Sequence, residues 1–239
     1  MNALQDSPLG DNARVAGLLY LVVVLTGMFS LAYVPSQIPL DDNAAKTVAN
    51  ILAHPQLYRL GIVASLVCYC AFLALPLALY RLLCPYGKNA AVLMVAFAAA
   101  SVPISFVNIL HKFDVLSLLS GADFLHAYTT EQLNAQVMFA LDAYGNGLLV
   151  SQIFWGLWLM PFGYLVFTSA VLPRFLGVLL MLGCLGYLTN FLGHALSADY
   201  AHTGIGGFIR LPAALGEIGT CLWLLIMGAR TPTFNRAMA

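Results

Sequence analysis

Nine polar or charged side chains fall within or at the ends of long apolar segments, where such residues are costly and often functional. They are Arg59, Asn108, His111, Asp142, Asn146, Asn190, His194, Arg210 and Glu217. Asp142 and Asn146 are one helical turn apart and therefore share a face of any helix that contains them. Placing a carboxylate at the centre of a membrane helix costs about 2.5–3.5 kcal/mol of insertion free energy. Such a residue is therefore expected to have a polar partner or a functional role.

These residue types suit three kinds of functional site. The first binds or transports a small polar solute, or relays protons. The second is a catalytic zinc site in which His111, Asp142 and His194 leave one position for water, although no HExxH motif supports it. The third is a b-type haem between His111 and His194. The alternative to all three is a purely structural network that fixes helix register.

The composition indicates a membrane protein and argues against nucleic acid as a binding partner. Of the 239 residues 61% are hydrophobic and only 8% are charged, whereas soluble domains carry about 25% charged residues. Net charge is zero and no basic run occurs, so nucleic acid is excluded as a partner. The five cysteines show no CxxC spacing, which argues against a disulfide framework and a thiolate zinc site. The sequence requires no cofactor and leaves open whether the protein is an enzyme.

Six apolar segments are long enough to span a bilayer and predict an all-α, polytopic membrane protein. The predicted helices cover residues 15–34, 59–83, 90–119, 130–168, 175–196 and 209–227. A shorter amphipathic helix is predicted at about 43–54, in the first external loop. It is expected to lie flat at the membrane interface, or else to cover a pocket as a lid. We treat residues 1–239 as a single membrane domain.

Local signals refine three of these helices. Pro35 is expected to end the first helix. Thr129 and Gln132 match a capping box at the start of the fourth helix, and Pro161 predicts a kink within it. The glycine-rich fifth helix is expected to pack closely against its neighbours, because small residues let membrane helices approach one another.

The distribution of lysine and arginine predicts the orientation. Six basic residues fall on one side of the predicted bilayer: Arg14, Arg81, Lys88, Arg174, Arg230 and Arg236. Four fall on the other: Lys46, Arg59, Lys112 and Arg210. The positive-inside rule therefore places both termini in the cytoplasm.

With this orientation, the nine polar residues gather in the non-cytoplasmic half of the bundle and predict a pocket that opens outward. We expect five of them to face the interior: His111, Asp142, Asn146, His194 and Glu217. Asp142 is expected to approach His111 or His194.

Several segments of the chain resemble one family. The runs RVAGLLYL, ANILAHP, LSGAD, QIFWGLWLMPFGYLV, LPRFLGVLLMLGCLGYL and LPAALGE are similar to those of the bacterial domain-of-unknown-function family 4386, over about residues 12–230. The resemblance implies a six-helix bacterial membrane protein. It implies no activity, so it transfers no catalytic or binding residues.

The prediction is therefore a multi-pass protein of the bacterial inner membrane, with the lipid bilayer as its partner. Its predicted activity is to bind, sense or translocate a small polar solute or a proton. A metal-dependent intramembrane enzyme is the main alternative, and a b-type haem protein is the next. The oligomeric state stays open, a homo-oligomer included.

Overall fold

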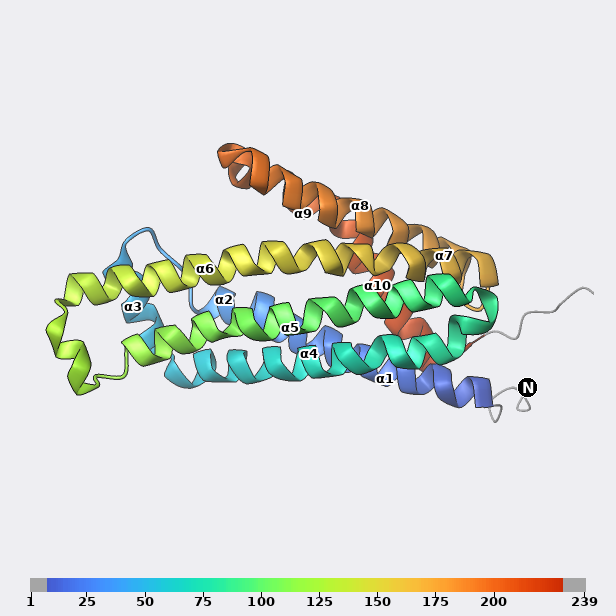
Figure 1. The fold of residues 1–239 in the computed structure, drawn as a ribbon, viewed down its shortest axis with the longest axis horizontal. Coiled ribbons are helices and arrows are strands. Elements are labelled where there is room, and N and C mark those ends of the chain that lie inside the picture. Colours follow the sequence, from blue (N-terminus) through green and yellow to red (C-terminus); the bar gives the residue numbers. More distant parts are fainter. Residues whose placement is uncertain (1–7, 230–239) are drawn as a thin grey trace, which may run out of the picture. The chain divides into compact units, whose positions relative to one another are not determined.

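The computed structural model describes residues 8–229, which form helices and turns with no strand in that range. Six helical spans are long and apolar enough to cross a membrane (Figure 1): Asn12–Gln37, Pro55–Tyr86, Lys88–Leu118, Thr130–Ser169, Arg174–Leu196 and Ile205–Ile226. Each corresponds to a predicted segment. The all-α, six-helix membrane architecture is confirmed.

The first span continues through Pro35, so the prediction that this proline ends the helix is wrong. Helix α1 covers Pro8–Met28, a π-helical turn follows at Phe29–Tyr33, and α2 covers Val34–Gln37. Proline has no amide hydrogen to donate to the carbonyl four residues earlier. The wider π-helical turn lies directly before Pro35 and lets the chain continue past this missing bond.

The later helices follow the predicted segments closely. The predicted helix 130–168 is divided into α6 and α7, and the short helix α9 directly precedes α10. They are α3 Ala44–Ala53, α4 Pro55–Leu83, α5 Lys88–Leu118, α6 Thr130–Leu157, α7 Leu159–Ser169, α8 Arg174–Leu196, α9 Ile205–Ile209 and α10 Leu211–Ile226. Short 3-10 turns cover Cys84–Tyr86, Asp123–Ala127 and Ala198–Thr203.

The start and the interruption of the fourth span have the causes expected from sequence. The backbone amide of Thr129 donates to Oε1 of Gln132 at 2.9 Å, and that of Gln132 donates to Oγ1 of Thr129 at 3.3 Å. This pair of bonds is a capping box. The helix is interrupted at Trp158, because Pro161 offers no hydrogen to the carbonyl of Leu157.

The internal contacts of the chain divide it into two compact units. Among the described residues, unit 1 comprises 8–21, 72–101 and 152–229, and unit 2 comprises 22–71 and 102–151. Helices α1, α4, α5 and α6 contribute residues to both units. The units are described separately below.

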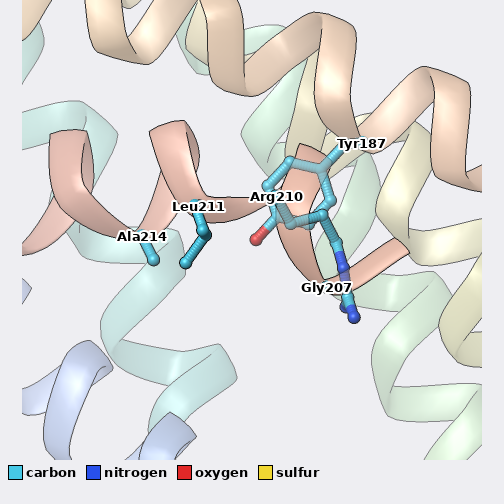
Figure 2. Close-up of a pocket in the computed structure, with 5 residues that line it drawn as sticks. All are labelled: Tyr187, Gly207, Arg210, Leu211 and Ala214. Carbon is cyan, nitrogen blue, oxygen red and sulfur yellow. The ribbon is translucent and has the colours of Figure 1, made fainter. Parts of the chain in front are cut away.

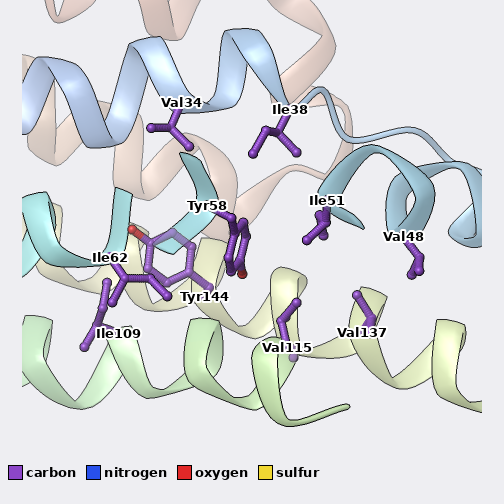
Figure 3. Close-up of a cluster of buried hydrophobic side chains, with 11 residues drawn as sticks. Val34, Ile38, Val48, Ile51, Tyr58, Ile62, Ile109, Val115, Val137 and Tyr144 are labelled. Atoms are coloured by element: carbon purple, nitrogen blue, oxygen red, sulfur yellow. The ribbon is translucent and has the colours of Figure 1, made fainter. Parts of the chain in front are cut away.

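Unit 2 has a hydrophobic core that includes the short helix α3. Thr47, Val48 and Ile51 of α3 are buried, and Val48 and Ile51 belong to the same cluster of buried side chains as Tyr58 and Tyr144 (Figure 3). The predicted amphipathic helix is therefore present, and its apolar face packs against protein.

Unit 1 is organised around glycine contacts between α7, α8 and α10. A methyl group added to Gly177 would lie 2.6 Å from the carbonyl oxygen of Gly163, and one added to Gly183 would lie 2.7 Å from Cα of Ala213. Such distances require hydrogen in place of a side chain at both glycines. The expected close approach of the glycine-rich helix is confirmed.

Candidate functional site

The polar residues of α8 in unit 1 form a connected group. Asn190 is 2% exposed, and its Nδ2 donates to Oε1 of Gln152 at 2.7 Å. His194, one turn later, has Nδ1 2.9 Å from the carbonyl oxygen of Asn190, and its ring packs edge-on against Tyr200. Oδ1 of Asn190 is buried and has no hydrogen-bond partner among the described residues. The C-terminal end of α8 thus offers one unused buried acceptor.

A pocket of about 250 Å³ lies between α8, α9 and α10 (Figure 2). Its lining consists of Tyr187, Gly207, Arg210, Leu211 and Ala214. Figure 2 shows the ring of Tyr187 beside the side chain of Arg210. The pocket therefore combines one guanidinium and one phenol with a small apolar surface.

The guanidinium of Arg210 is only partly used by the protein. Its Nε donates to the carbonyl oxygen of Gly206 at 2.8 Å. Arginine has five N–H donors, so four are left without an acceptor among the described residues. These donors form the planar fork that binds carboxylates and phosphates.

Glu217 lies two helical turns beyond Arg210 on the same face of α10. Its carboxyl group lies near Tyr187, as does Arg210, and near the fully buried Tyr20 of α1. Arg210 and Glu217 form no ion pair. The two ion pairs among the described residues involve Lys46 with Asp41 and His111 with Asp114. The guanidinium of Arg210 therefore has no acidic partner among the described residues.

The expectation that Asp142 and Asn146 face the interior is wrong. They share a face, since Nδ2 of Asn146 donates to Oδ2 of Asp142 at 3.2 Å, but both side chains are exposed. The span Thr130–Ser169 has 40 residues and is about 60 Å long, twice the roughly 30 Å hydrocarbon layer. Part of this helix must therefore lie outside that layer.

His111 is also placed differently from the prediction. Its side chain is 39% exposed, with Nδ1 3.4 Å from Oδ2 of Asp114. It therefore pairs with Asp114 and not with Asp142. The adjacent Lys112 faces inward and is 7% exposed, because successive helical residues point about 100° apart.

A polar stripe along α5 identifies the inward face that sequence reasoning missed. Ser101, Ser105, Asn108 and Lys112 are all at most 7% exposed and follow the helical spacing i, i+4, i+7, i+11. Asn108 was predicted to line the site, and its Nδ2 donates to the carbonyl oxygen of Tyr144 at 3.0 Å. The spacing of the stripe was visible in the sequence and would have singled out Lys112.

The remaining predicted residues occupy different parts of the fold. Arg59 is exposed on the first turns of α4. For the zinc and haem hypotheses, His111 and Asp142 belong to unit 2 and His194 to unit 1. Within the described part of the chain, no three His, Cys, Asp or Glu side chains gather closely enough to hold a metal ion. Both hypotheses stay predictions.

Comparison with known proteins finds relatives without an assigned activity. Residues 15–228 match the family described as "Domain of unknown function (DUF4386)". The chain is 27% identical over 157 residues to an uncharacterised protein of the archaeon Archaeoglobus fulgidus, covering 64% of this chain and 74% of that protein. No solved structure matches the chain.

Proposed function

The chain belongs to the DUF4386 family, and for this member we propose that it binds, senses or translocates a small polar solute through a pocket in the non-cytoplasmic half of its helices. The observation that carries the proposal is the pocket beside Arg210, with four unused guanidinium N–H groups at one end. The volume of about 250 Å³ equals roughly eight water molecules, which suits a small organic solute.

The chemistry of the lining favours a carboxylate solute. The free N–H groups of Arg210 match the two oxygens of a carboxylate, while Leu211 and Ala214 offer apolar contact to a short carbon chain. A small amino acid or hydroxy acid therefore fits the charges better than a simple cation.

A thermal-shift experiment on the purified full-length protein tests this function. Glycine should raise the melting temperature, and methylamine, which lacks the carboxylate, should not. The glycine effect should be lost in Arg210→Gln and kept in Arg174→Gln, whose arginine lies at the other end of α8, above the ring of Phe167. An equal glycine effect in both variants, or none in the wild-type protein, would contradict the proposal.

The location of the pocket depends on the orientation of the chain. We propose the inner membrane of a bacterium, with both termini in the cytoplasm, on the basis of the lysine and arginine distribution. Single cysteines introduced at Lys46 and Lys88 test it in intact cells, after the native cysteines are replaced. An impermeant thiol reagent should label position 46 and spare position 88, and the opposite pattern would reverse the orientation.

A further inference from the structure

Lys112 of α5 is a buried cation with aromatic neighbours and no acidic partner. Its side chain is 7% exposed. Its Nζ lies 4.4 Å from the ring centroid of Tyr144 and 5.9 Å from that of Tyr58. The described residues offer it no carboxylate within ion-pair distance and no hydrogen-bond acceptor. The neighbouring acid, Asp114, is exposed and paired with His111.

The aromatic contacts satisfy only part of this charge. Ring faces attract an ammonium group electrostatically, but they accept none of its three N–H bonds in the way that oxygen does. The hydroxyl of Tyr58 is a second buried group without a hydrogen-bond partner among the described residues. Unit 2 therefore brings a cation and an unused hydroxyl donor to one place, and this pattern calls for an anionic acceptor.

The walls around Lys112 belong to one apolar cluster. Tyr58 of α4 and Tyr144 of α6, whose rings face its ammonium group, pack in this cluster together with Ile109 and Val115 of α5 (Figure 3). Ile51 of α3 belongs to the same cluster. An anion here would be surrounded by a low-dielectric environment, in which its attraction to the ammonium group is strong.

Helix α3 forms one wall of this cluster. Its side-chain hydrogen bonds stay within the loop that carries it, since Oγ1 of Thr47 bonds to the backbone of Asp41 and Nδ2 of Asn50 donates to the carbonyl oxygen of Pro39. Its attachment to the rest of unit 2 is apolar, through Val48 and Ile51. His54 alone separates α3 from α4.

We propose that Lys112, with Tyr58 and Tyr144, forms a binding site in unit 2 for a small oxyanion, a carboxylate or a phosphate, covered by α3. The site involves none of the residues that line the pocket beside Arg210. The two proposals can therefore be tested separately.

The reactivity of the lysines tests this site directly. The full-length protein in lipid nanodiscs is treated with an amine-reactive ester, and mass spectrometry follows the acylation of Lys112 and Lys88. Acetate or inorganic phosphate, compared with chloride at equal ionic strength, should slow the acylation of Lys112 several-fold and leave Lys88 unchanged. Protection by acetate alone assigns a carboxylate, and protection by phosphate alone assigns a phosphate.

An acylation rate of Lys112 that neither anion lowers relative to Lys88 would overturn the proposal and leave a lysine held by aromatic contacts alone. Should Lys112 react too slowly to follow, the melting temperature decides. Acetate or phosphate should stabilise the wild-type protein more than Lys112→Met, which keeps an unbranched side chain one atom shorter and removes its charge. Equal stabilisation of the two proteins, or none of either, would overturn the site. An anion bound only beside Arg210 gives equal stabilisation and does not protect Lys112.

Discussion

The substitution Gly183→Ala tests the packing that holds α10, and with it Arg210, against α8. The new methyl group would lie 2.7 Å from Cα and 2.8 Å from Cβ of Ala213. Contacts under 3.0 Å essentially never occur and ordinary contacts begin at 3.4 Å. The helices α8 and α10 must therefore separate by at least 0.3 Å, the difference between 3.0 and 2.7 Å, and by 0.7 Å to reach ordinary contact. Backbone atoms cannot rotate away as a flexible side chain does.

The expected cost follows from known overpacking effects. Overpacking costs about 1–3 kcal/mol, and contact with backbone favours the upper end of that range. Alanine in place of glycine returns about 1 kcal/mol of helix propensity. The net loss is about 2 kcal/mol, which lowers the melting temperature by about 4–8 °C at this chain length.

Thermal unfolding of the purified protein measures this loss, and Gly145→Ala is the matched control. Gly145 also lies within a long helix, and a methyl group there meets nothing within 4 Å. The control should keep or raise the melting temperature. A Gly183→Ala protein as stable as the Gly145→Ala protein would refute the close packing of α8 and α10.

Three further predictions concern unit 2 and the loop before α4. Asp142→Asn should change the stability by less than about 1 kcal/mol, because exposed polar pairs contribute little; a melting curve showing a loss of several kcal/mol would mean that the carboxylate is buried. A hydrogen bond from Lys46 lowers the pKa of Asp41 below its ordinary 3.8, and the same bond raises the pKa of Lys46 above 10.5. The pair therefore stabilises the loop fully at pH values between 3.8 and 10.5, the ordinary pKa values of the two groups. This stabilisation is lost as the pH falls through the lowered pKa of Asp41 or rises through the raised pKa of Lys46. The difference in melting temperature between the wild-type protein and Lys46→Met should accordingly shrink below pH 3.8, and a difference that grew there would contradict this sign. Ile51→Ala should weaken the attachment of α3 by about 2–4 kcal/mol, because it removes a buried side chain; hydrogen exchange over α3 should rise, whereas Leu52→Ala, at an exposed position, should leave it unchanged.

The helices could be predicted because the properties that define them are local. Eighteen or more apolar residues mark a span wherever they occur, and the capping box at Thr129 and the interruption before Pro161 follow from backbone hydrogen bonding alone. Pro35 was misjudged because a π-helical turn precedes it, and nothing in its neighbours distinguishes that outcome from a helix end.

The faces of the helices could not be predicted with the same certainty. The rotation of a membrane helix about its axis is set by packing against its neighbours, and a change of one residue turns the face by 100°. That single step separates His111, predicted to be inside, from Lys112, which is inside. The same rotation explains Asp142 and Asn146, which are exposed, while Tyr144 between them is buried.

A high-resolution crystal structure of the natively purified protein, soaked in glycine, would show whether the pocket beside Arg210 binds a carboxylate. We expect compact density in the pocket of α8, α9 and α10, with oxygens about 2.7–3.2 Å from the guanidinium nitrogens of Arg210. An acyl chain filling the pocket while Arg210 forms an ion pair with Glu217 would contradict it.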